Sequence, residues 1–178
     1  MDVQTLFELV IFIIPAYIAN SAPVVFGGGD ALDGGRIFSD KRPIFGSSKT
    51  LRGFLAGVAF GALAGICLAL FAGAYYFPSL DKAGKIFLAT ALALGAMLGD
   101  LAGSFVKRRL AMRPGAPSLF LDQLPFFLGA LALGALAWPG LLQALGIDGF
   151  LVLAVLTVLL HAFFNFLANK AGLKKVPW

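Results

Sequence analysis

The sequence has one cysteine, one histidine and few charged residues. Cys67 has no second cysteine with which to form an internal disulfide, and because it lies within an apolar run we expect it to be inert packing. His161 lacks a partner at metal-ligand spacing, so we expect it to hydrogen-bond to Asn165 or to a neighbouring helix. Charged residues make up only 13% of the 178 residues and hydrophobic residues make up 60%, which excludes an ordinary soluble domain and indicates an integral membrane protein.

Several apolar stretches are long enough to cross a bilayer as helices. The five stretches are residues 3–19, 53–77, 86–106, 119–138 and 149–168. No basic segment precedes the first stretch, which argues against a cleaved signal peptide, and Pro15 should kink this helix near its end. We therefore predict an all-α integral membrane protein with five transmembrane helices, in which residues 1–178 form a single transmembrane domain.

Lysine and arginine are distributed very unevenly between the two sides of this arrangement. Only Lys82 and Lys85 fall on one side, whereas the other twelve of the 14 cations fall on the opposite side. These twelve are Arg36, Lys41, Arg42, Lys49, Arg52, Lys107, Arg108, Arg109, Arg113, Lys170, Lys174 and Lys175. Because cytoplasmic loops carry the excess of cations, we predict that the N-terminus lies outside the cell and the C-terminus in the cytoplasm.

Polar side chains occur in three of the expected spans, in each case toward the cytoplasmic side. They are Asp100, Asp122, His161 and Asn165. Ionisable groups at membrane depth are costly unless they face a partner or a water-filled cavity. We therefore predict a single polar cavity, formed between these spans, that opens to the cytoplasm.

Residues 99–123 connect two of these spans, and they have the composition of a metal-assisted phosphate site. Asp100 and Asp122 bracket a group of four cations, 107–109 and 113. Carboxylates bind magnesium, which is usually held together with substrate phosphates, while Lys and Arg neutralise phosphate oxygens directly. Ser104, one helical turn beyond Asp100, could join the metal shell or bind a phosphate. The alternative is that two loop acids simply flank a basic cytoplasmic loop.

The first cytoplasmic loop, residues 20–52, is rich in glycine and contains the sequence GSSKT at residues 46–50. This is not a Walker A loop, because the first glycine of that motif is missing and no strand precedes it. Its small residues and hydroxyls nevertheless lead into Lys49 and Arg52 where the next helix begins, and an anion could bind at that helix N-terminus. The alternative is a flexible basic loop that is attracted to anionic lipid.

Four segments together resemble the archaeal CDP-archaeol synthases over almost the whole chain. They are PAYIANSAP (15–23), FGSSKTLRG (45–53), GDLAGSFVKRR (99–109) and LDQLPF (121–126). The third is also similar to the carboxy-terminal signature of the longer bacterial CDP-diacylglycerol synthases. The resemblance implies a membrane-bound cytidylyltransferase that uses magnesium to convert CTP and unsaturated archaetidic acid, an isoprenoid ether lipid phosphate, to CDP-archaeol and pyrophosphate. We expect a multi-pass protein of the cell membrane, with its active site facing the cytoplasm and no nucleic-acid partner.

The resemblance and the residue chemistry together give a set of candidate site residues. We expect Asp100 and Asp122 to hold the metal and to be catalytic together with Lys49 and Lys107, which would neutralise phosphates. The expected substrate-binding residues are Asn20, Ser47, Ser48, Thr50, Arg52, Ser104, Arg108 and Arg109. The hydroxyls and backbone of residues 47–50 are candidates for reading cytosine, and that assignment stays open.

Two other functions are compatible with parts of the sequence. Asp33-Gly34-Gly35-Arg36 resembles part of the CDP-alcohol phosphotransferase motif, but the two further aspartates of that motif, spaced four apart, do not occur. A small transporter with a cytoplasmic anion site would also carry buried polar groups. Transporters usually have repeated halves with interrupted helices, and an odd number of spans with no visible repeat disfavours that function.

Overall fold

The computed structural model describes residues 3–113, 116–118 and 120–172, and within these ranges the regular secondary structure is helical apart from two isolated bridges. The five helices are α1 (Val3–Phe26), α2 (Leu51–Phe71), α3 (Lys82–Arg109), α4 (Leu124–Ala137) and α5 (Leu141–Lys170). Lys174 and Lys175, two of the cations used to predict orientation, lie outside the described residues, as does Leu119 at the expected start of the fourth span.

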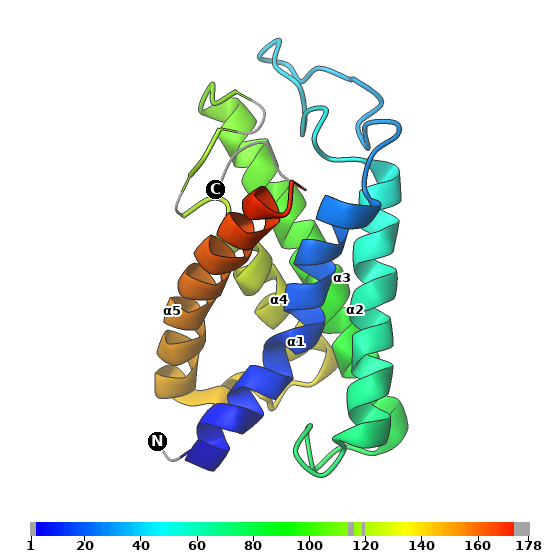
Figure 1. Cartoon of the computed structure of the whole chain (residues 1–178), viewed down its shortest axis with the longest axis vertical. Coiled ribbons are helices and arrows are strands. Elements are labelled where there is room, and N and C mark those ends of the chain that lie inside the picture. Colours follow the sequence, from blue (N-terminus) through cyan, green and yellow to red (C-terminus); the bar gives the residue numbers. More distant parts are fainter. Residues whose placement is uncertain (1–2, 114–115, 119, 173–178) are drawn as a thin grey trace.

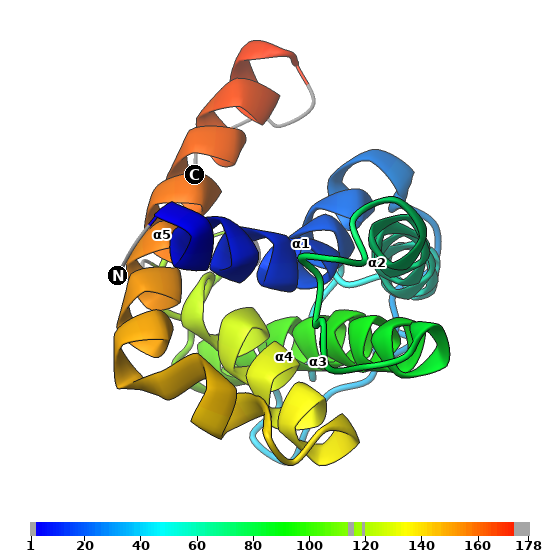
Figure 2. The same ribbon diagram turned by 90° about the horizontal axis from the view of Figure 1, so that it is seen from below.

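The helices alternate in direction along the long axis of the molecule (Figure 1). Seen along that axis, α1 lies beside α2 and α3 beside α4, with α5 at one edge (Figure 2). The loop at 27–50, the end of α3 and the end of α5 all lie at the same end of the molecule (Figure 1). The first loop and the cations at residues 107–109 therefore lie at one end of the molecule. The sequence predicted that they share one side of the membrane.

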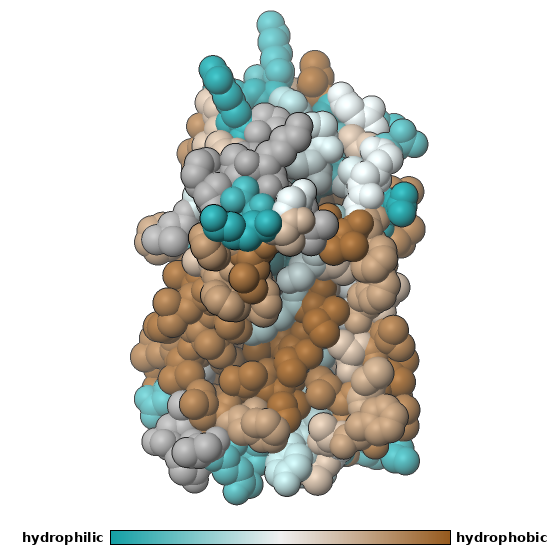
Figure 3. All heavy atoms as spheres, viewed as in Figure 1, coloured by the Kyte–Doolittle hydropathy of each residue, from teal (hydrophilic) through white to brown (hydrophobic). Residues whose placement is uncertain are grey.

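The surface supports the prediction of an integral membrane protein. A broad hydrophobic band covers the middle of the face shown, and hydrophilic residues gather at both ends (Figure 3). Among the described residues, α1, α2, α3 and α5 are each long and apolar enough to cross a membrane. The all-helical architecture predicted from the sequence is therefore confirmed.

The fourth helix is shorter than the expected span. It has 14 residues, Leu124–Ala137, which at roughly 1.5 Å per residue is about 21 Å and less than the thickness of a bilayer core, about 30 Å. Pro125 fits only in the first helical turn because it has no N–H, and the residues before it form turns. The expected link after this helix is mostly helical, since α5 begins at Leu141 and is kinked at Gly146, where φ is 62° and ψ is 175°.

Glycines allow α3 and α4 to pack backbone against backbone. A Cβ added at Gly99 would lie 2.0 Å from the carbonyl oxygen of Pro125, and one added at Gly129 would lie 2.3 Å from the carbonyl oxygen of Gly95. Any larger residue at these positions would force the two helices apart. This close packing sets the separation between Asp100, on α3, and the segment that precedes α4.

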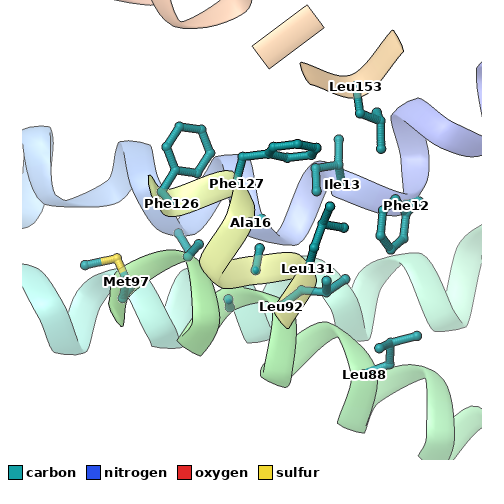
Figure 4. Packing of buried hydrophobic residues seen from close by; sticks show 14 of the residues in the cluster. Phe12, Ile13, Ala16, Leu88, Leu92, Met97, Phe126, Phe127, Leu131 and Leu153 are labelled. Carbon is teal, nitrogen blue, oxygen red and sulfur yellow. The ribbon is translucent and has the colours of Figure 1, made fainter. Parts of the chain in front are cut away.

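The hydrophobic core lies where α1, α3 and α4 meet. Ile13, Leu92, Phe127 and Leu131 are all buried there and come from these three helices (Figure 4). From α5, Leu141 at its start and Leu153 near its middle belong to this cluster. Most other residues of α5 are partly or fully exposed, so this helix packs less closely than the other four and leaves a space beside α1.

Candidate active site

A cavity of about 770 Å³ lies between α1, α5 and the polar end of α3. One part of its lining is polar or charged: Asn20, Ser21, Ser48, Lys49, Asp100, Ser104, Lys107, Arg108, Asp122, Thr157, His161 and Asn165. The other part is mainly apolar and includes Val10, Ile14, Ile18, Leu160 and Phe164. The cavity is therefore amphipathic, and its volume is in the range of ordinary small-molecule sites.

The first loop reaches the cavity through Lys49. The Nζ of Lys49 donates to both carboxylate oxygens of Asp100, at 2.7 and 2.5 Å. The neighbouring Thr50 caps α2, because its hydroxyl oxygen accepts a hydrogen bond from the N–H of Gly53 at 3.1 Å. The cap fixes the position at which the loop joins α2, and Lys49 is held immediately before it.

A second ion pair lies at the end of α3. The Nζ of Lys107 lies 2.6 Å from one carboxylate oxygen of Asp122 and also donates to the carbonyl oxygen of Ala116. The other carboxylate oxygen of Asp122 accepts a hydrogen bond from the N–H of Ser118 at 2.8 Å. Lys107 is only 6% exposed, so this buried ammonium is held by oxygen acceptors of the loop that follows α3.

Arg108 is the most deeply buried cation that lines the cavity, at 4% exposure. One terminal nitrogen donates to the carbonyl oxygen of Arg113 at 3.0 Å. Its Nε is buried, and no hydrogen-bond partner for it occurs among the described residues. An anion in the cavity could supply an acceptor for this guanidinium, because arginine presents several donors in a fixed planar arrangement.

The cavity brings together eight of the twelve candidate residues predicted from the sequence. These are Asn20, Lys49 and Ser48 from α1 and the first loop, and Asp100, Ser104, Lys107, Arg108 and Asp122 from the second polar region. Four others, all of them described residues, do not line it: Ser47, Thr50, Arg52 and Arg109. Ser47 and Arg52 are exposed, and Thr50 serves as the cap of α2.

Arg109 has a different environment from its two neighbours in the basic run. Its guanidinium lies over the rings of Phe38 and Phe105, at 4.8 and 4.7 Å from their centroids. It also donates to the carbonyl oxygens of Arg42 and Pro43, and its Nε lies 3.2 Å from a carboxylate oxygen of Asp40. Arg109 therefore fastens the first loop to α3.

The residues that form the apolar wall of the cavity were not identified from the sequence. Val10, Ile14 and Ile18 follow one another at four-residue spacing on α1, and Leu160 and Phe164 have the same spacing on α5. This spacing places each set on one helical face. Nothing in an almost wholly apolar helix distinguishes such a face from one that contacts lipid or the core. Between them, the hydroxyl of Tyr17 on α1 forms a hydrogen bond with that of Thr157 on α5 at 2.8 Å.

The donor set fits a magnesium ion that is shared with substrate. Asp100 and Asp122 both line the cavity, and each carboxylate is held beside an ammonium group. Within the described ranges there is no group of three or more His, Cys, Asp or Glu side chains that could hold a metal. Magnesium usually takes one or two carboxylates together with substrate phosphates and water, so two carboxylates in a polar cavity meet that requirement.

Comparison with known proteins gives consistent similarities over nearly the whole chain. A family model described as "CarS-like: CDP-archaeol synthase" matches residues 3–178. The CDP-archaeol synthase of Pyrococcus furiosus is 46% identical over 94% of this chain and 95% of its own length. The CDP-archaeol synthase of Aeropyrum pernix is 41% identical over 99% of this chain and 94% of its own length.

A solved structure is similar as well. Its description reads "Structural insight into an intramembrane enzyme for archaeal membrane lipids biosynthesis", and it has 41% sequence identity to this chain with a TM-score of 0.73. The similarity covers 89% of this chain and 93% of that one. The resemblance drawn from the four sequence segments is thereby confirmed.

Proposed function

The chain belongs to the CDP-archaeol synthase family, and we propose that the cavity between α1, α3 and α5 is its catalytic site. The enzyme is a nucleotidyltransferase that joins the cytidylyl group of CTP to an isoprenoid ether lipid phosphate, unsaturated archaetidic acid, and releases pyrophosphate. The assignment of the site rests on one observation: a single cavity is lined both by two lysine–carboxylate pairs and by an apolar wall. Such a cavity offers a charged end to the phosphates of CTP and an apolar wall to a lipid.

The reaction requires positioning and charge neutralisation rather than a strong base. The lipid phosphate is already an anion, and it attacks the α-phosphorus of CTP in line with the leaving pyrophosphate. Two groups of like charge must therefore approach each other. Lys49, Lys107 and Arg108 line the cavity and offer preorganised cationic donors for the phosphate oxygens. Ser104, which also lines it, adds a hydroxyl one turn beyond Asp100.

Asp100 and Asp122 would hold magnesium together with the phosphates of CTP. When bound, the ion supplies further neutralisation of the triphosphate and of the leaving pyrophosphate. Each aspartate is paired with a lysine in the structure: Asp100 with Lys49, and Asp122 with Lys107. Each pair therefore consists of one proposed metal ligand and one proposed phosphate ligand. If the two carboxylates bound magnesium instead, both ammonium groups would be free to contact phosphate oxygens.

The isoprenoid chains of the lipid would lie along the apolar wall between α1 and α5. Val10, Ile14 and Leu160 are part of that wall, and the cavity continues from them to the polar residues near Asp100. A lipid phosphate could therefore reach the polar end while its chains remain in an apolar environment. The looser packing of α5 against the other helices favours access from the bilayer on this side.

The polar end of the cavity would face the cytoplasm. Every described lysine and arginine except Lys82 and Lys85 belongs to the loops and helix ends at that end of the molecule. This agrees with the excess of cations expected on the cytoplasmic side, where CTP is available. The protein would then be a multi-pass enzyme of the cell membrane, with the N-terminus outside and with CTP reaching the site directly from the cytoplasm.

The two alternative functions are not favoured by the family. The Asp33–Arg36 segment that resembles a CDP-alcohol phosphotransferase motif forms turns of the first loop. The carboxylate of Asp33 is occupied by backbone N–H groups, which is a structural arrangement. A transporter with an anion site also lacks support, since the relatives over nearly the full length are synthases.

A pyrophosphate-release assay tests the proposed function directly. Purified protein is incubated with CTP and magnesium, with or without a lipid phosphate. Pyrophosphate should appear only when the lipid is added, and the labelled cytidylyl group should be recovered in the lipid phase. Parallel reactions with ether and ester lipids define the lipid selectivity. Release of pyrophosphate without lipid, or none with it, would contradict the proposal.

A further inference from the structure

The first loop is folded around one carboxylate that does not itself line the cavity. Asp33 is 9% exposed and accepts three backbone hydrogen bonds. One oxygen accepts from the N–H of Gly35 at 3.0 Å, and the other accepts from Phe45 at 2.8 Å and from Gly46 at 3.0 Å. The carboxylate therefore ties the start of the loop to the segment just before α2.

That segment carries Lys49. The carbonyl oxygen of Gly46 accepts a hydrogen bond from the N–H of Lys49 at 3.1 Å, and the carbonyl oxygen of Lys49 accepts one from Leu32, the residue before Asp33, at 2.7 Å. Phe45 and Lys49 both line the cavity. Gly46, between them, has φ of +95°, a conformation that a side-chain-bearing residue would adopt only at a cost. Glycine reaches this conformation freely, and the carboxylate of Asp33 holds the turn in place through the N–H groups of Phe45 and Gly46.

We propose that Asp33 is a positioning residue that holds Lys49 in the catalytic site through the 45–46 turn. The inference rests on the role proposed above for Lys49. Asp33 does not contact the reacting atoms; it fixes the backbone from which Lys49 reaches Asp100. Burial alone would raise the pKa of Asp33, but the N–H groups of Phe45, Gly46 and Gly35 outweigh it and keep the pKa below its ordinary value, so the carboxylate stays charged.

The substitution Asp33→Asn tests this role because asparagine has one acceptor oxygen where aspartate has two. Whichever way the amide turns, its NH₂ group faces either the N–H of Gly35 or the N–H groups of Phe45 and Gly46, and the negative charge is lost. Asp30→Asn is the matched control, since Asp30 is an exposed acid of the same loop and loses the same charge. Asp33→Ala, which removes both oxygens without adding donors, is measured in the same way in case Asp33→Asn does not fold.

Two measurements are made on the full-length protein. Hydrogen exchange of peptides covering residues 44–51 reports the loop, and steady-state kinetics with varied CTP report its consequence for the reaction. Loss of the charge-assisted bonds to the backbone should speed exchange in this segment by at least about tenfold and reduce kcat/KM for CTP by about tenfold. Exchange in α1 and α3 should stay as in the parent, and Asp30→Asn should match the parent in both measurements.

A double-mutant cycle with Lys49→Ala separates positioning of Lys49 from any other effect. In the Lys49→Ala background, Asp33→Asn should cause little further loss of kcat/KM, because the group that it positions is gone. An equal loss in both backgrounds, or unchanged exchange at residues 44–51, would overturn the inference. If Lys49→Ala alone keeps parental turnover, the proposed role of Lys49 fails together with the catalytic part of this inference, and the exchange data decide separately whether Asp33 anchors the loop.

Discussion

Lys49 and Asp100 form an ion pair across 51 positions of the sequence, with the ammonium nitrogen 2.7 and 2.5 Å from the two carboxylate oxygens. The pair connects the first loop to the second half of the long helix α3, on the wall of the cavity. Both side chains keep some exposure, 24% and 19%, so the pair is accessible to a ligand. A phosphate and a divalent cation entering together would offer each partner a stronger interaction.

Removing the ammonium group of Lys49 should weaken CTP binding. We expect Lys49→Ala to raise the KM for CTP and to leave the dependence on lipid concentration nearly unchanged. The loss of one charge-assisted contact corresponds to about 1.5–3 kcal/mol. Arg52→Ala is the matched control, because Arg52 is exposed and does not line the cavity. Steady-state kinetics with each substrate varied make the comparison, and equal effects of both substitutions would argue that Lys49 has no special role.

The close packing of α3 on α4 should tolerate no added side chain. Gly99→Ala places a methyl group 2.0 Å from the carbonyl oxygen of Pro125, and such overpacking typically costs about 1–3 kcal/mol. We expect a lower melting temperature and, because Asp100 is the next residue, lower activity. Ala102→Val, at an exposed position of α3, should leave both nearly unchanged. A parental melting temperature for Gly99→Ala would show that the two helices can separate more easily than their contacts indicate.

The orientation in the membrane can be tested by cysteine labelling in a Cys67→Ala background. Ser47 and Gln143 are both exposed and lie at opposite ends of the molecule. A cysteine at position 47 should react with a membrane-impermeant maleimide only from the cytoplasmic side, and one at position 143 only from outside. Labelling of both positions from the same side would contradict the arrangement of the spans.

Acidification should remove the stabilisation that Asp33 provides. Its pKa in the folded protein is below the ordinary value of 3.8, so its contribution is fully present above that value and is lost as the pH falls through the lower folded pKa. Thermal melting of the parent and of Asp33→Asn should therefore differ most near neutral pH. The difference should shrink below about pH 4. A difference that is constant with pH would mean that the charge of Asp33 does not stabilise the loop.

Sequence reasoning predicted the helical fold and most of the cavity's polar residues, because these depend on local patterns. Long apolar stretches define helices, and an acid within one of them, such as Asp100, stands out at once. The shorter α4 was not predicted, because an apolar stretch does not reveal where a helix begins. The turn at residues 120–123 and Pro125 decide that boundary.

The pairing of charges could not be predicted from the sequence. Lys107, Arg108 and Arg109 are consecutive, but the helix directs them to different surroundings. Lys107 and Arg108 line the cavity, the first of them paired with Asp122, whereas Arg109 lies against Phe38 of the first loop. Successive residues of a helix point about 100° apart, so a basic run cannot be one uniform phosphate-binding surface. Which of its members faces the site depends on the tertiary packing of α3.

The central claim is that Asp100 and Asp122 together hold the metal on which turnover depends. Asparagine at either position keeps the size of the side chain and one oxygen acceptor for the paired lysine, but it weakens binding of a divalent cation. Asp148→Asn, at an exposed position near the opposite end of the molecule, is the control.

Magnesium-dependent formation of CDP-lipid, measured alongside thermal melting, tests this claim most directly. The account predicts that Asp100→Asn and Asp122→Asn each fold, the second with a lower melting temperature because the buried Lys107 loses its charged partner. It also predicts that neither forms CDP-lipid at any magnesium concentration at which the parent and Asp148→Asn are active. Parental activity in either folded variant would remove that aspartate from the site and contradict the account.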